Sequence, residues 1–398
     1  MKNYQILLSF FIVFLCSINW GQSLLSLTYP LGLPQIPNSS SAYQMGGVST
    51  GIPDGHNVML TNPGNLGAIN NISFSSLLRV DYLRINEADS HTDHISVLPQ
   101  QISFALPLGY AGTIALSISK PSNASFKYRT TEPFGRVSVH KNGGFNSWQA
   151  GIGHSIGKFV NIGFAYERIY FSVKQTKFTE SKNHEMFEKD SSDLYFRGNG
   201  IRLGLLGTIK NFAIGIAGNY YFEDNLIYRH GLYTGTGNTA YYTSRSFSLK
   251  PPPMISGGIS YSFSPKLIVG TDVSVTLWDY YSISQDNILV NINKENTFMF
   301  GIGTRFIPAP NLLAPKYWET MNYRAGFRYA QLPGNTSQEF AVTMGVGLPL
   351  RGNGLLDLGL EIGNRTSDNF KNYNEKFLHF SIGINGGGKW HKAKINTY

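Results

Sequence analysis

The chain has 398 residues and a formal net charge of +9 at pH 7, with 33 Lys and Arg residues against 24 Asp and Glu residues. The basic residues are dispersed rather than clustered, which argues against a nucleic-acid partner and leaves open a basic rim against anionic lipid. The 43 Gly, 26 Phe and 23 Tyr residues are typical of the glycine-rich, aromatic-ended strands of membrane β-barrels.

The N-terminus has the pattern of a cleaved secretory signal peptide over residues 1–21. Lys2 precedes an uncharged run over residues 6–18, and Gly21 supplies the small residue at which we expect cleavage. The run is too short to span a bilayer as a helix, and Gly, Ser or charged residues interrupt each later apolar stretch. The only cysteine, Cys16, lies within this leader behind a large residue. We therefore expect no lipidation, and no disulfide, Cys-metal site or thiol catalysis in the mature chain.

Residues 22–71 are predicted to form an N-terminal periplasmic segment followed by a plug. A Pro/Ser-rich part leads into a turn-rich stretch, residues 45–71, in which Gly-Gly and Asn-Pro-Gly sequences interrupt any regular strand or helix. Apolar residues such as Val48 and Ile52 recur along this stretch. The stretch should therefore pack inside another structure rather than hang free.

A period of two begins at Ile72 and continues almost to the C-terminus. Ile72 and Phe74 fall on one face of the first segment, and Ser73 and Arg79 fall on the other. A strand of a soluble β-sandwich shows the same alternation. Segment length and the alternation of long and short connections have to distinguish a membrane barrel from a sandwich. The predicted strands cover residues 72–82, 95–106, 110–119, 148–156, 160–170, 195–209, 212–222, 247–263, 267–277, 298–306, 321–329, 340–348, 356–362 and 378–384.

One of these segments, residues 247–263, contains three successive prolines at residues 251–253. Prolines cannot occupy the middle of a fully paired strand, because each removes a hydrogen-bond donor. We interpret the segment as one bent strand that begins properly near Met254, which makes about fourteen strands. Counting residues 247–250 separately would give about fifteen, whereas single-chain bacterial barrels have even numbers.

Long and short connections alternate between the strands, as they do in outer-membrane barrels. The predicted tight turns are residues 107–109, 157–158, 210–211, 264–265 and 351–353. The predicted outer loops are residues 85–94, 120–146, 174–194, 224–245, 279–296, 331–338 and 364–376. One connection, residues 308–319, is long although it should lie on the periplasmic side.

These features predict an all-β fold, a transmembrane antiparallel β-barrel of about 14 strands with an N-terminal plug. The barrel should cover residues 72–385, with residues 386–398 as a periplasmic C-terminal tail. We expect the protein in the outer membrane of a Gram-negative cell, in contact with outer-membrane lipid, after export through a cleaved signal peptide.

The plug sequence resembles the N-terminal hatch of FadL-type outer-membrane transporters, a family that carries long-chain fatty acids and other hydrophobic compounds such as toluene. In that family a Gly-Gly segment and an Asp precede an Asn-Pro-Ala motif. The matching residues here are Gly46, Gly47, Asp54, Asn62, Pro63 and Gly64. The departure is Gly64, where the family usually has Ala.

A second part of the chain shows the same resemblance. Its residues are Pro252, Pro253, Gly258, Tyr261, Asp272 and Trp278, followed by the sequence YRAGFRY at residues 323–329 and Pro333. The resemblance thus extends over nearly the whole mature chain. It implies passive diffusion of a hydrophobic small molecule through a plugged barrel, past the hatch and sideways through a kinked strand, without a cofactor. Glycine-rich stretches at residues 198–207 or 257–258 are candidates for such a bend.

Two sets of residues are candidates for ligand contact. On strand parity, Arg324 and Arg328 face the lumen together with Asp272, Glu339, Asp357 and Glu361. This group is either a lattice of ion pairs that stiffens the wall or a patch that binds a carboxylate head group. The apolar plug residues Val58, Met59 and Leu60 either contact cargo or simply pack against the wall.

The sequence does not predict an enzyme or a metal site. His91 and His94 lie near Asp89 and Asp93 in the first predicted outer loop, but their spacing is irregular for a metal site. Adjacent residues on a strand point to opposite faces, so the pair at residues 154–155, His-Ser, cannot form a dyad. Neither a nucleophile elbow nor an H-E-x-x-H motif occurs.

A structural or secretion-associated outer-membrane barrel that docks a protein partner at its outer loops is the alternative function. The lumen should distinguish the two functions. An apolar pocket that reaches the outer loops favours uptake, whereas a sealed lumen with apolar loop tips favours docking.

Overall fold

The computed structural model describes most of the region after the predicted leader. The described residues are 23, 25, 31–35, 39–87, 90–133, 135–181, 187–235, 238–283, 295–310, 312, 314–333, 337–350, 354–368 and 373–388. The predicted signal peptide, the turn at residues 351–353 and the chain beyond residue 388 lie outside them. No helix among the described residues is long and apolar enough to cross a bilayer.

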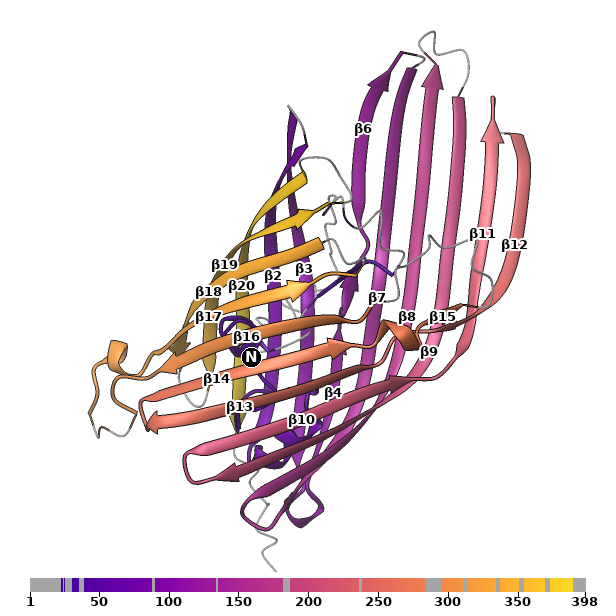
Figure 1. Ribbon diagram of the computed structural model, residues 1–398. Coiled ribbons are helices and arrows are strands. Elements are labelled where there is room, and N and C mark those ends of the chain that lie inside the picture. The colour runs from indigo at the N-terminus through magenta and orange to yellow at the C-terminus, as the bar shows by residue number, and fades with distance from the viewer. Residues whose placement is uncertain are drawn as a thin grey trace, which may run out of the picture.

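Fourteen antiparallel strands close into a barrel, which confirms the predicted fold class and strand number. Each strand of the wall pairs with its neighbours along the chain, and the first strand closes the barrel against the last (Figure 1). The wall strands are β2 (Ile72–Glu87), β3 (Ser90–Pro107), β4 (Thr113–Ser119), β7 (Gly135–Ile156), β8 (Val160–Ser181), β9 (Phe187–Ile209), β10 (Phe212–Tyr221), β13 (Met254–Ser264), β14 (Leu267–Thr276), β16 (Thr297–Phe306), β17 (Asn322–Gln331), β18 (Ser337–Pro349), β19 (Leu355–Ser367) and β20 (Tyr373–Gly388).

The wall is apolar on the outside and small or polar on the inside. On β4, Ile114 and Leu116 are exposed, whereas the alternate residues Ala115 and Ser117 are buried. A soluble protein places such residues the other way round. An outward apolar row on strand after strand is the surface that a barrel presents to lipid.

Part of the sheet continues well beyond the barrel (Figure 1). β7, β8 and β9 contain 22, 22 and 23 residues, about twice the 9–11 residues that cross a membrane. Three further strands join them: β6 (Phe126–Glu132) pairs with β7, and β11 (Asp224–Thr234) and β12 (Asn238–Lys250) continue from β9. We call these six strands above the barrel the extension, and name the two ends of the barrel the extension end and the turn end.

The extension corrects two sequence predictions. Residues 120–146, 174–194 and 224–245, predicted as outer loops, are largely β-strand. Residues 247–250 belong to β12, and residues 247–249 pair with residues 224–226 of β11. Residues 247–263 are therefore two strands separated by the prolines rather than one bent strand. The number of wall strands is unchanged because β12 lies in the extension.

The turn end agrees more closely with the sequence. The predicted turns at residues 107–109, 157–158, 210–211 and 264–265 connect consecutive wall strands there. The long connection over residues 308–319 lies at the same end, because Phe306 pairs with Leu267 and Tyr323. Residues 386–388 are the end of β20 and pair with Ile72–Phe74, so the predicted tail does not begin at residue 386.

The plug fills the lumen towards the turn end. It contains a short helix, α2 (Ser40–Tyr43), and a 3-10 helix, η2 (Pro63–Ala68), joined by buried chain. Inward-facing glycines of the wall leave room for it. A Cβ added at Gly258 would lie 2.7 Å from Gly51 N, and one at Gly301 would lie 2.6 Å from Gly46 O. The glycines that meet the plug in this way, here called the glycine belt, are Gly151, Gly153, Gly163, Gly204, Gly215, Gly258, Gly270, Gly301, Gly303, Gly326, Gly345, Gly359 and Gly383.

The glycine belt predicts a difference between two neighbouring positions on β13. A Cβ at Gly258 would lie 2.0 Å from Asp272 Oδ1, whose carboxylate binds Ser49 N and Thr50 N of the plug, and 2.7 Å from Gly51 N, whereas one at Gly257 meets nothing within 4 Å. We expect Gly258→Ala to lower the free energy of unfolding by about 1–3 kcal/mol, the usual cost of overpacking. The midpoint of heat-induced unfolding, followed by gel mobility in detergent, should fall for Gly258→Ala and stay unchanged for Gly257→Ala. Equal midpoints for the two variants would contradict close packing of the plug at β13.

Candidate ligand cavity in the barrel lumen

The first two glycines of the plug motif end α2. Both have left-handed backbone conformations, with φ of +69° at Gly46 and +86° at Gly47, which side chains rarely adopt. Gly47 N donates to Ala42 O at 2.9 Å, and Gly46 N donates to Thr343 Oγ1 of β18 at 2.9 Å. The pair therefore turns the chain and ties it to the wall.

Asp54 organises the next turn of the plug. Its carboxylate accepts hydrogen bonds from His56 N at 2.9 Å, Asn57 N at 3.2 Å and Asn57 Nδ2 at 2.7 Å. Arg305 of β16 lies 3.8 Å away as its ion-pair partner. All of the Asp54 contacts named here are internal to the plug and wall.

Asn62, Pro63 and Gly64 join the plug to β9 and start η2. Asn62 Oδ1 accepts from Gly64 N at 3.0 Å and caps the helix, and Pro63 occupies its first turn. Asn62 Nδ2 donates to Thr50 O at 2.8 Å and to Leu205 O at 3.0 Å. The motif is therefore a structural joint between plug and wall.

The apolar plug residues Val58, Met59 and Leu60 are buried. Val58 and Leu60 pack with Leu66 and Ile69 of the plug and with small wall residues such as Ala165. None of the three candidate residues is among those that line the lumen cavity described next.

A cavity of about 280 Å³ lies on the extension side of the plug. Plug residues Ser49, Thr50 and Thr61 form its floor. Its apolar wall consists of Leu31, Phe145, Ile169, Met254, Trp278, Phe298, Met299 and Leu332. This wall continues into an apolar cluster on the inner face of the extension, which includes Phe171, Phe196, Leu226 and Phe247.

The roof of the cavity is the N-terminal segment over residues 31–35. Within it, β1 (Leu33–Pro34) pairs with β5 (Ser122–Asn123). Ser122 Oγ donates to Leu31 O at 2.7 Å, and Gln35 Oε1 accepts from Arg79 Nη2 at 2.5 Å. The sequence predicted periplasmic or plug-entry chain here, and the segment lies on the extension side, where buried Leu31 and Leu33 anchor it. A Pro/Ser-rich composition does not indicate at which end of the barrel a segment lies.

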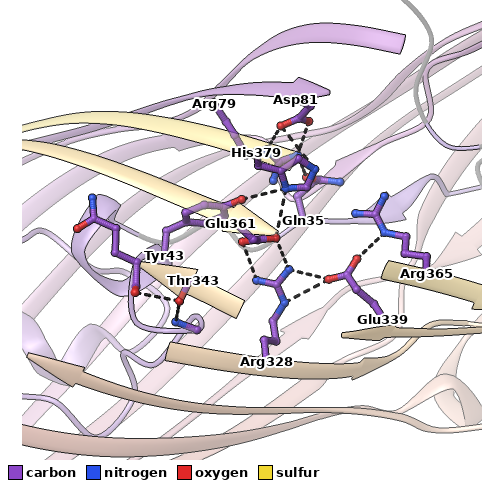
Figure 2. A network of polar contacts seen from close by, with 12 residues as sticks. Gln35, Tyr43, Arg79, Asp81, Arg328, Glu339, Thr343, Glu361, Arg365 and His379 are labelled. Carbon is purple, nitrogen blue, oxygen red and sulfur yellow. Dashed lines mark hydrogen bonds and ion pairs between the residues drawn. The ribbon is translucent and has the colours of Figure 1, made fainter. Parts of the chain in front are cut away.

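Ion pairs form the other wall of the cavity (Figure 2). Arg328 Nη2 lies 2.6 Å from Glu339 Oε1 and 2.8 Å from Glu361 Oε1. Arg365 contacts Glu339 at 2.5 Å and also pairs with Glu375. All of these groups are almost completely buried, so their charges depend on one another for compensation.

The same network reaches the plug. His379 Nδ1 lies 3.2 Å from both Glu361 Oε1 and the Tyr43 hydroxyl of α2 (Figure 2). Arg79 pairs with Asp81 at 2.5 Å. The plug is thus connected by hydrogen bonds to the charged part of the wall.

Arg324 and Arg328 have different positions. Arg324 Nη1 lies 2.6 Å from Asp357 Oδ1 and 2.8 Å from Gln44 Oε1 of the plug, and it does not line the cavity. Arg328 lines it. The structure therefore brings only Arg328, of the five predicted ligand residues, to the cavity.

Several residues of the site were not singled out from the sequence. Arg365 continues the inward parity of Asp357 and Glu361 but lies beyond the predicted end of that strand. Arg79 falls on the polar face of the first predicted strand but was given no role there, and its partner Asp81 follows two residues later on the same face. The aromatic residues Phe145 and Trp278 come from different parts of the chain, and only the fold brings them together.

The polar residues beside the histidines considered from the sequence have partners of their own. Asp93, near His94 on β3, forms an ion pair with Arg84 at 2.9 Å. Ser155 Oγ donates to Gly67 O and Asn161 Oδ1, on the face of β7 opposite to His154. The side chain of His91 and residue Asp89 lie outside the described part.

Solved structures with the same fold are channels and transporters of hydrophobic compounds. CymD, a monoaromatic hydrocarbon channel, has a TM-score of 0.62 and 15% identity, covering 92% of this chain and 100% of its own. The toluene transporter TbuX of Ralstonia pickettii has a TM-score of 0.62 and 16% identity over 90% of this chain and 100% of its own. A Pseudomonas aeruginosa FadL homologue has a TM-score of 0.65 and 11% identity over 89% of this chain and 99% of its own.

At these identities the likeness establishes the fold, which is the FadL-type plugged barrel that the plug motif suggested. No curated protein matches the chain. A family profile, BamG, matches residues 2–396, nearly the whole sequence. The chain therefore belongs to the BamG family.

Proposed function

We propose that this protein is an outer-membrane barrel that takes up a hydrophobic small molecule and passes it by passive diffusion. The observation that carries the proposal is the cavity of about 280 Å³ between the plug and the segment over residues 31–35. One side of it is aromatic and aliphatic, and it lies directly on the apolar inner face of the extension. An apolar pocket that continues towards the outer strands was the feature expected for uptake.

The size of the cavity favours a compact cargo. Pockets for small molecules usually measure about 300–1,000 Å³, so this one is at the lower limit. It has room for a molecule of about one aromatic ring or for part of an acyl chain. Monoaromatic hydrocarbons, the compounds named for CymD, and toluene, the compound named for TbuX, have this size. A long-chain fatty acid would extend beyond the cavity.

The charges around the cavity favour a neutral cargo. Arg328 already contacts two carboxylates and Arg365 contacts two, so neither guanidinium is available to a carboxylate head group without displacing a buried partner. Breaking a buried pair in this way costs about 3–5 kcal/mol. We therefore infer that these ion pairs stabilise the wall and the plug and do not bind the cargo.

The pairing of β3 supports a route out of the lumen. β3 pairs with β4 only from Gln101 to Pro107, and a register shift opposite Leu77 and Leu78 leaves Gln100 as a bulge. Between residues 90 and 100, β3 has a partner strand only on its β2 side within the described part of the chain. By contrast, residues 257–258 and 198–207, the bends considered from the sequence, are regularly paired. We infer that cargo leaves beside the outer half of β3.

Filling the cavity should abolish binding. Ala330 lines it, whereas Ala325 lies on the same strand and faces outward. We expect Ala330→Phe to weaken toluene binding by at least about tenfold, the effect of losing about 1.4 kcal/mol of contact. Ala325→Phe should bind like the natural protein. Calorimetry or native mass spectrometry in mild detergent measures this, and equal binding by all three proteins, or none by the natural one, would overturn the proposed cargo site.

A second candidate function, docking of a protein partner, is favoured by the extension. It adds three strands and prolongs β7, β8 and β9 beyond the length needed to cross a membrane. Among the described residues, β6 and most of β12 are edge strands with a partner on one side. Tyr128 on β6 and Tyr241 on β12 are exposed.

Single-cysteine variants can test the docking candidate, because the only cysteine of the chain is Cys16 in the predicted leader. A photoreactive label on Tyr128→Cys or Tyr241→Cys in intact cells should give the same protein adduct if the extension docks a partner. The matched control is Tyr317→Cys at the turn end, which should give none. Absence of an adduct from both extension positions would leave uptake as the function.

A further inference from the structure

A groove runs along the membrane-facing surface of four neighbouring strands. One cross-strand row of outward residues there is Phe104 on β3, Leu116 on β4, Ala150 on β7 and Tyr166 on β8. Ala150 is the one small residue in this row of large ones. Its missing side chain leaves a notch between Leu116 and Tyr166.

The notch connects two hollows into one groove. The hollow nearer the turn end measures about 440 Å³ and the other about 350 Å³, and both are bordered by Phe104, Leu116 and Ala150. Phe164 borders the first hollow. The second ends at Trp148, Tyr166 and Arg168. The groove therefore has apolar sides along most of its length and a guanidinium at one end.

The position of Arg168 corresponds to the outer boundary of the membrane. Between Val160, at the turn end of β8, and Arg168 the strand climbs roughly 20 Å, at about 3.3 Å per residue and a tilt of about 40°. The apolar band of such a barrel is about 25 Å tall and is edged by aromatic residues. Trp148 and Tyr166 lie at this edge, and Arg168 lies just beyond Tyr166 on the same outward row.

Among the residues that the structure describes, Arg168 has hydrogen-bond and aromatic partners but no ion-pair partner. Its Nη1 donates to Asn199 Oδ1 at 2.5 Å, and its guanidinium lies 5.8 Å from the centre of the Tyr170 ring. Within the described part of the chain, no carboxylate lies within ion-pair distance of it. The lumen arginines around Glu339, in contrast, each contact carboxylates. A guanidinium left in this state recognises a phosphate strongly, because it can donate several charge-assisted hydrogen bonds.

We propose that the groove over β3, β4, β7 and β8 binds a membrane lipid with a phosphate headgroup. An acyl chain lies along the groove past Ala150, and the phosphate contacts Arg168. The groove opens on the membrane side of the wall, so its occupant is a lipid rather than a soluble molecule. A neutral lipid leaves the arginine uncompensated, which favours an anionic one. This site is separate from the lumen cavity and does not depend on the identity of its cargo.

Native mass spectrometry of the full mature protein in mild detergent tests the headgroup. The probes are bisphosphorylated lipid A, phosphatidylcholine and inorganic phosphate. We expect lipid A to be retained more strongly than phosphatidylcholine, and inorganic phosphate not to be retained. Arg168→Gln should reduce retention of lipid A about tenfold. The matched control, Arg197→Gln, changes an exposed arginine on the neighbouring strand that does not border the groove and should have no effect.

A second variant tests the acyl-chain part of the site. Ala150→Phe fills the notch and should reduce retention of both lipids about tenfold, whereas Ala325→Phe on the outward face of β17 should not. Heat-modified gel mobility shows whether each variant is folded. Unchanged lipid A retention in folded Arg168→Gln would overturn the phosphate contact. Equal retention of lipid A and zwitterionic phosphatidylcholine by the natural protein would overturn the preference for an anionic lipid. Unchanged retention in folded Ala150→Phe would overturn the groove.

Discussion

Backbone atoms of the plug lie directly against inward-facing glycines on most strands from β7 to β17, and plug side chains such as Gln44 and Ser40 lie against those on β18, β19 and β20, at distances that no added side chain could share. A barrel of fourteen strands encloses a lumen too wide for the wall side chains to fill, and the plug occupies part of it. Because the glycines allow the plug backbone to approach the wall closely, hydrogen bonds between side chains and main-chain groups fix the plug, such as Asn62 Nδ2 to Leu205 O and Gly46 N to Thr343 Oγ1. The cavity exists only on the side where this packing stops.

The buried ion pairs also attach the plug to the wall. Near β17 to β20 the wall holds the plug through Arg324, Gln44, Tyr43 and His379 rather than through close contact alone. Buried arginines are costly unless each is compensated, and here the compensation comes from carboxylates on adjacent strands. Such a lattice gives a rigid wall, and it is consistent with the proposal that cargo contacts the apolar side of the cavity around Trp278 and Phe145.

The sequence predicts the membrane part of the fold well because lipid imposes a regular pattern. Each wall strand needs an apolar outward row, and tight turns connect the strands at one end, so strand number and turns could be predicted. Beyond the membrane this constraint disappears. Segments such as residues 174–181 carry Lys, Gln and Thr on both faces, and their strand pairing could not be recognised from alternation.

The site was less predictable than the wall. Parity placed Arg328 in the lumen, but parity cannot distinguish it from Arg324, which faces inward on the same strand and is covered by the plug. The roof over residues 31–35 and the aromatic wall depend on contacts between segments that are far apart in sequence. The shape of the cavity depends on these long-range contacts, so no short stretch of sequence predicts it.

The path of the N-terminal segment has a consequence for how the molecule assembles. Residues 31–35 lie at the extension end, whereas Ile72 begins β2 at the turn end, so the chain between them passes lengthwise through the lumen. The wall closes where β2 meets β20, the last strand to be synthesised. A filled lumen offers no room to thread the segment through afterwards. Pairing of the first and last strands must therefore follow placement of the plug, and the barrel closes around its own N-terminal chain.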